Sequence, residues 1–104
     1  MFVVIIFYSN YMYTIDPYTY NQAEKIKVTV KPSKKANKKI DVFDSRDDQY
    51  ITSVGDIRYG DYPTYLRTRG EEYANKRRKA FHKRFKTENI TPYTNIYYSA
   101  KLLW

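Results

Sequence analysis

The sequence predicts an α+β domain in which a small three-stranded antiparallel sheet is packed by one or two C-terminal helices. Three observations indicate this class: short apolar–polar alternations fill the first half of the chain, helical periodicity fills the second half, and 104 residues suffice for little more than one domain. We place this basic domain at residues 23–104. Residues 1–22, which are apolar and rich in tyrosine, are assigned to an N-terminal arm or extension.

Three short segments predict the strands of the sheet. Residues 25–31 alternate strictly between lysine or threonine and apolar residues, which indicates a half-buried strand that Pro32 ends. Residues 39–43 and 50–54 form the second and third strands, separated by an Asp- and Ser-rich turn. We therefore expect a three-stranded antiparallel meander, in which the lysines of the first strand lie near Asp41.

Two helices are expected after the sheet. Thr68 and Glu71 have the spacing of a capping box, which predicts a helix over residues 69–86. Its apolar residues fall on one side and its lysines on the other. Thr91-Pro92 has the form of a helix cap followed by proline at the first helical position, which predicts a second helix over residues 92–103.

The charge of the chain concerns its partners. It carries 19 Lys and Arg against 11 Asp and Glu, a formal net charge of +8. Such a balance favours nucleic acid, an anionic membrane surface or an acidic protein as partner; the alternative is a solvated surface that serves solubility. The cations concentrate in the first predicted helix and around the loop between the first two strands. The candidate nucleic-acid-binding residues are Lys76, Arg77, Arg78, Lys79, Lys83, Arg84, Lys34, Lys35, Lys38 and Lys39.

Two features of this candidate surface are left open by the sequence. The lysine-rich loop between the first two strands, here called the basic loop, forms one positive patch with the helix if it lies beside the helix. If it lies on the opposite side, the hypothesis of nucleic-acid binding is weaker. Tyr59, Tyr62 and Tyr65 precede the helix. They either stack on bases, as aromatic residues do in single-strand binders, or cover the junction between sheet and helix.

The sequence holds no recognisable catalytic or metal-binding set. It has no cysteine and a single histidine, His82, which excludes a thiolate zinc site and disfavours a conventional transition-metal cluster. Asp47 and Asp48 lie in a predicted turn, where Asp is expected for backbone reasons. The three glycines form no phosphate-binding loop. We therefore expect a non-enzymatic protein without a cofactor.

The first eight residues form an apolar run. This run is much shorter than the roughly 20 residues that a membrane-spanning helix needs. It also lacks the positive segment and the small-residue cleavage site of a signal peptide. We therefore expect neither membrane insertion nor export.

Three stretches of the sequence together form a pattern. They are Val54-Gly55-x-x-x-Tyr59-x-Asp61-Tyr62, Lys76-Arg77-Arg78-Lys79-x-Phe81-x-Lys83-Arg84 and Leu102-Leu103-Trp104. Over about residues 24–104 the chain resembles an uncharacterised family of small basic proteins encoded by large nucleocytoplasmic DNA viruses. Arg58, Pro63 and Phe85 depart from the family's pattern. The resemblance implies a location in the virion or inside the host cell, in the cytoplasm, nucleus or viral factory, but no activity.

The sequence favours one function and leaves a second open. We expect electrostatic binding of nucleic acid, most naturally DNA, without strong readout of base sequence. The alternative is a minor capsid-associated structural protein that bridges larger viral subunits. In that case residues 1–22 and the many tyrosines would carry the contacts, because tyrosine is enriched at protein interfaces. The oligomeric state is not determined by the sequence.

Overall fold

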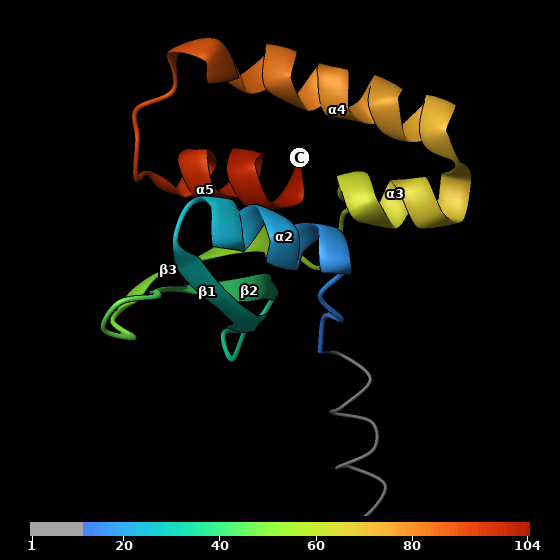
Figure 1. The fold of residues 1–104 in the computed structure, drawn as a ribbon. Coiled ribbons are helices and arrows are strands. Elements are labelled where there is room, and N and C mark those ends of the chain that lie inside the picture. Colours follow the sequence, from blue (N-terminus) through green and yellow to red (C-terminus); the bar gives the residue numbers. More distant parts are fainter. Residues whose placement is uncertain (1–11) are drawn as a thin grey trace, which may run out of the picture.

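The computed structural model describes residues 12–104, and within them a three-stranded sheet is covered on one face by helices (Figure 1). The strands are β1 (Val28–Pro32), β2 (Lys38–Asp44) and β3 (Tyr50–Asp56), paired antiparallel in the order β1-β2-β3. The helices are α2 (Pro17–Lys25), α3 (Tyr62–Arg69), α4 (Glu71–Phe85) and α5 (Asn95–Leu103), with a 3-10 turn, η1 (Thr87–Asn89). The predicted α+β class and its three-stranded antiparallel sheet are confirmed.

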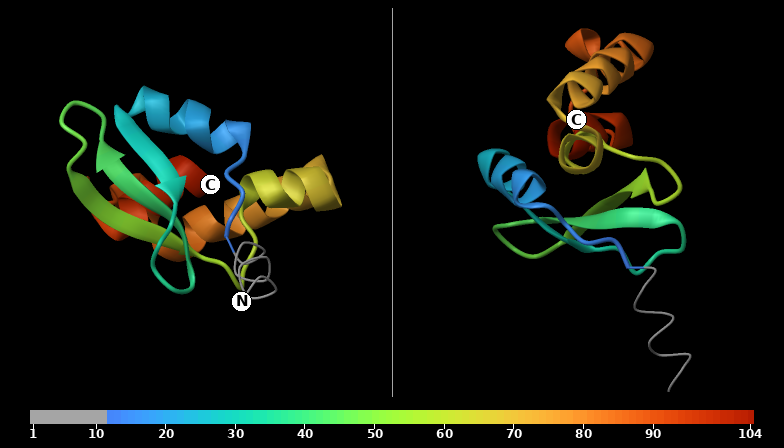
Figure 2. Two further views of the ribbon diagram at one scale, coloured as in Figure 1. Left: turned by 90° about the horizontal axis from the view of Figure 1, so that it is seen from below. Right: turned by 90° about the vertical axis from the view of Figure 1, so that its right-hand side faces the viewer.

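The elements form three layers, which the views in Figure 2 show from two further sides. The sheet is one outer layer. Helix α2 packs against β1 and α5 packs against β3, so these two helices make the middle layer. Helix α4 is the other outer layer: it joins α3 through one residue and lies beyond α5, away from the sheet.

The core lies between the sheet and the middle layer. Ile40 and Val42 of β2 and Leu102 of α5 are completely buried there. Each such side chain stabilises the fold by about 1.5–3 kcal/mol relative to exposure in water. The remaining buried apolar residues of this cluster are Ile15, Ala23, Val28, Val30, Val54, Tyr98 and Leu103.

Residues 12–22, which the sequence assigned to an arm, pack into the same folded unit. Asp16 caps α2 by accepting a hydrogen bond from the amide of Tyr18 at 2.9 Å, and Pro17 occupies the first helical position. The buried hydroxyl of Thr19 donates to the carbonyl of Leu102 at 2.9 Å, which ties α2 to the end of α5. The boundary drawn after residue 22 falls inside α2. The arm's residues 1–11 lie outside the described residues.

The strand bounds differ from the predicted ones by more than one residue at two places. The first strand begins at Val28, because α2 extends through Lys25 and the chain turns at Lys27 with φ 60°. The third strand continues through Gly55 to Asp56, two residues beyond its predicted end at residue 54. Gly55 has φ +84°, and a side chain there would meet Lys39 and Leu103 at about 3 Å. Glycine is therefore required at this position for β3 to pass the core.

The register of the sheet places Lys31 opposite Asp41, as the meander predicts. The Asp41 carboxylate is buried and accepts hydrogen bonds from the hydroxyls of Ser33 and Ser53 and from the amide of Lys34. Burial alone would raise the pKa of Asp41, but these hydrogen bonds outweigh it and hold that pKa below its usual value. Asp41 is thus satisfied by neutral donors rather than by a cross-strand ion pair.

Both predicted helix starts are wrong, although the helices themselves exist. Thr68 cannot cap α4, because it lies inside α3 and its hydroxyl donates to the carbonyl of Thr64 at 2.7 Å. The chain turns instead at Gly70, with φ 91°, and α4 begins without a side-chain cap. Likewise α5 begins at residue 95, where Thr94 rather than residue 91 provides the cap.

A buried ion pair joins the sheet to α3. Lys39 Nζ lies 2.7 Å from Asp61 Oδ2, and the two side chains are 4% and 0% exposed. Asp61 also accepts a hydrogen bond from the Tyr13 hydroxyl at 2.6 Å and one from the Thr64 amide at 2.9 Å. Burial alone would raise the pKa of Asp61, but the Lys39 ammonium and these hydrogen bonds hold it below its usual value. Burial and Asp61 together raise the pKa of Tyr13.

We predict that Asp61→Asn lowers the free energy of unfolding by about 3 kcal/mol or more, because Lys39 is left as an uncompensated buried charge. Urea unfolding at neutral pH measures this. The folded-state pKa of Asp61 is depressed, so its stabilisation is present above the unfolded pKa of about 3.9 and is lost as the pH falls below it. The variant should therefore lose less stability than the wild type on acidification.

The control is Asp56→Asn, because the Asp56–Arg58 ion pair lies at the surface. Surface ion pairs contribute little to stability, so its urea midpoint should stay near that of the wild type. Equal losses in the two variants would contradict a special role for the buried pair.

Candidate nucleic-acid interface

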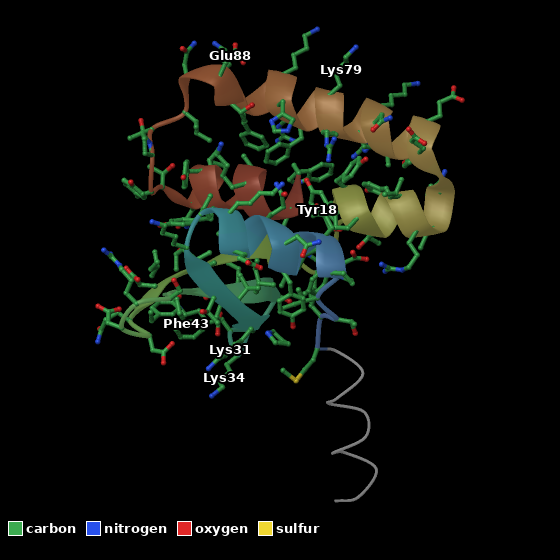
Figure 3. The ribbon with its side chains drawn as sticks, viewed as in Figure 1. Tyr18, Lys31, Lys34, Phe43, Lys79 and Glu88 are labelled. Carbon is green, nitrogen blue, oxygen red and sulfur yellow. The ribbon has the colours of Figure 1, made fainter. Side chains whose placement is uncertain are left out.

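The outer face of α4 carries three exposed lysines in one row. Lys76, Lys79 and Lys83 follow one another at i, i+3 and i+7, and Figure 3 shows Lys79 pointing away from the rest of the molecule. We call these three residues the lysine row; it extends about 10 Å along the helix axis. Two glutamates in the first turn of α4 interact favourably with the positive end of the helix dipole, which stabilises the helix that carries the row. The row lies on one face of a helix, as predicted.

The lysine row has no acidic partner within residues 12–104. In this part of the chain, four ion pairs form, and none of them uses a residue of α4. The pairs are Lys39–Asp61, Arg46–Asp44, Arg58–Asp56 and Arg67–Asp16. The carboxylates nearest in sequence to α4's cations are thus its own two N-terminal glutamates and Glu88 of η1. The positive charge of the row faces solvent.

Arg78 is not part of this exposed surface. Its guanidinium carbon lies 3.4 Å from the centre of the Tyr62 ring, and one terminal nitrogen donates to the Tyr18 hydroxyl at 3.1 Å. Its Nε is buried without a hydrogen-bond partner. Arg78 therefore fastens α4 to α3 and α2, and the prediction that it contacts nucleic acid does not fit its position.

Lys39 is also not part of the candidate surface, because it is buried. The alternation of β2 predicts that it points away from the core, but β2 is buried continuously from Lys39 to Val42. The ammonium lies against Asp61 and 5.3 Å from the centre of the Tyr13 ring. A side chain covered in this way cannot reach a phosphate, so the prediction for Lys39 is replaced by a structural role.

The basic loop lies at the opposite end of the molecule from α4. Figure 3 shows Lys34 at the far side of the sheet, whereas Lys79 stands on the outermost helix. Lys35 and Lys38, which flank the same turn, are exposed, and Lys35 Nζ lies 5.0 Å from the centre of the Tyr50 ring. Loop and helix do not form one patch, so the lysine row must act without the loop.

A cleft of about 600 Å³ opens between the inner side of α4, α5 and the chain after β3. Arg77 and Arg84 line it from α4, where their guanidinium carbons lie 5.6 Å and 5.2 Å from the ring centres of Tyr65 and Phe85. Its aromatic lining consists of Tyr59, Tyr65, Phe81, Phe85 and Trp104. The sequence indicated only an apolar stripe here, because periodicity cannot distinguish a packed stripe from one that leaves a cleft.

The three tyrosines before α4 divide between two roles. Tyr62 packs under Arg78, and the Tyr65 ring lies so close to Gly60 that a Cβ there would come within 2.6 Å of it. These two cover the junction between sheet and helix. Tyr59 is 67% exposed at the cleft, so its ring is available to a partner.

Comparison with protein-family models, with curated proteins and with solved structures finds no match to this chain. The resemblance to small basic viral proteins therefore stays a prediction. Among the helices of residues 12–104, none has the length and apolar character needed to cross a membrane.

We predict that Arg78→Gln lowers the free energy of unfolding by about 1–2 kcal/mol, because it removes a desolvated cation–π contact and the packing of a long side chain. Thermal unfolding followed by circular dichroism measures the loss. Lys79→Gln is the matched control, since it removes the same charge from the adjacent position on the exposed face. A melting temperature that is equally unchanged in both variants would show that Arg78 does not fasten α4.

Proposed function

We propose that the protein binds nucleic acid electrostatically through the lysine row on α4, without reading base sequence. The observation that carries this proposal is the combination of exposure, regular spacing and missing acidic partners in the described chain. An unneutralised row of ammonium groups on a helix attracts a polyanion and releases its counterions on binding.

The chemistry of the row favours backbone contact over base recognition. Lysine is a flexible point charge, whereas base recognition in the major groove uses planar or bidentate groups such as arginine and asparagine. Phosphate contacts position a protein on nucleic acid but carry no direct sequence information. The resemblance to small basic proteins of large DNA viruses adds DNA as the natural polymer to test.

The alternative role is that of a structural protein that bridges larger viral subunits, in which residues 1–22 and the many tyrosines would carry the contacts. The two functions differ in one measurable respect. Nucleic-acid binding requires affinity for isolated DNA that falls steeply with salt. A bridging role predicts that isolated DNA is not bound, even at low salt.

We predict that the wild-type protein binds duplexes of unrelated sequence with equal affinity and with a log–log salt slope of about −4 or steeper. Replacing Lys76, Lys79 and Lys83 together by Gln should reduce the steepness of this slope by about 3, because each lost phosphate contact contributes about 0.9. Fluorescence anisotropy of labelled duplexes across a salt series measures both quantities.

The control replaces Lys34, Lys35 and Lys38 by Gln, which removes the same charge at the opposite end of the molecule. This variant should keep most of the wild-type slope. Equal losses in the two variants would mean that only net charge matters, and an unchanged slope in the α4 variant would overturn the proposal. Absence of binding at low salt would favour the bridging role.

A further inference from the structure

The aromatic cleft beneath α4 leaves large rings partly in water. Tyr59 is 67% exposed and Phe85 is 37% exposed. Phe81 and Trp104 stack on one another in the cleft wall, with ring centres 4.8 Å apart and planes inclined by 10°. Exposed rings beside an already stacked pair form a surface onto which a further planar ring can stack.

The charged residues of this cleft that form no ion pair with another residue of the described chain are both positive. Asp56 is held by Arg58 at 2.7 Å, and Lys39 is held by Asp61. Arg77 and Arg84 remain, two helical turns apart on α4, and neither takes part in an ion pair within residues 12–104. The cleft therefore suits a ligand that is planar and apolar in one part and anionic in another.

Single-stranded nucleic acid has this chemistry, and a duplex does not offer it. Bases in a duplex are stacked on one another and cannot enter a side cleft, whereas an unpaired base presents both faces of its ring. Guanidinium groups bind phosphate oxygens through a fork of donors, so Arg77 and Arg84 can hold the phosphates that flank an inserted base. The lysine row lies on the same helix, so the backbone can continue along it.

We propose that this cleft binds unstacked bases of a single strand, so that the protein prefers single-stranded nucleic acid over duplex. The inference rests on the proposed function, to which it adds the form of the polymer. Tyr59 and Phe85 stack on the bases, while Arg77 and Arg84 contact the adjoining phosphates. Stacking of this kind tolerates any base, in agreement with binding that does not depend on sequence.

Trp104 provides a direct signal from this site, because it is the single tryptophan of the chain and it lines the cleft. Titration with a short oligothymidylate should quench its emission, and a duplex of the same length should leave the emission nearly unchanged. The single strand should also bind about tenfold more tightly or better. Tyr59→Ala and Phe85→Ala should each weaken single-strand binding by about tenfold, as is typical when a stacking ring is removed.

Tyr93→Ala is the matched control, since Tyr93 is 76% exposed but lies outside the cleft. It should bind both polymers like the wild type, and Tyr59→Ala should keep its duplex affinity. Circular dichroism of each variant checks that the fold is retained.

Three outcomes would overturn the inference. They are equal affinity for single strand and duplex, unchanged single-strand affinity in both cleft variants, and quenching of Trp104 by heparin, a polyanion without bases, as strong as that by the oligonucleotide. If the α4 lysine variant still loses salt-dependent binding in these cases, the proposed function stands without the cleft. If neither polymer binds at low salt, both proposals fail.

Discussion

The fold depends on the buried carboxylate of Asp61. This carboxylate accepts hydrogen bonds from the ammonium of Lys39 at 2.7 Å, the hydroxyl of Tyr13 at 2.6 Å and the amide of Thr64 at 2.9 Å. These contacts join the segment before α2, the central strand and the first turn of α3, which are far apart in the sequence. Burying two charges costs several kcal/mol, and only a complete set of partners offsets that cost. Any change that removes one partner therefore loosens three elements together.

The position of α4 follows from that junction. Asp61 fixes the start of α3, and α3 passes into α4 through Gly70 alone. Between α4 and the middle layer, the described contacts are mainly between rings or between a cation and a ring, such as Arg78 on Tyr18 and Phe81 on Trp104. These contacts lie apart from one another along the helix, so they hold α4 in place and leave the cleft beneath it open. The same arrangement leaves one face of α4 to solvent and lines a cleft with the other.

The sequence predicted the sheet because alternation and turn residues are local signals, and it predicted α4 because fifteen residues give a clear periodicity. It missed α2 and α3, which have nine and eight residues. Asp16-Pro17 and Asp61-x-Pro63 carry the cap-and-proline signal that was read at Thr91-Pro92, where no helix begins. Helices this short depend on tertiary packing. The same local signal therefore marks a helix start in two places and does not in a third.

The candidate site was harder to predict, because a sequence counts every cation alike and only the fold assigns their partners. The sequence places the lysines of the first strand near Asp41, and Lys31 does lie opposite Asp41, but no carboxylate of the described chain forms an ion pair with these lysines. Instead Asp44 and Asp56 pair with arginines two residues later, Asp61 pairs with Lys39 in the interior, and Asp41 is satisfied by hydroxyl and amide groups. These carboxylates are unavailable to α4. The proposed binding of a polyanion therefore depends on where the negative charges are held rather than on the net charge of +8.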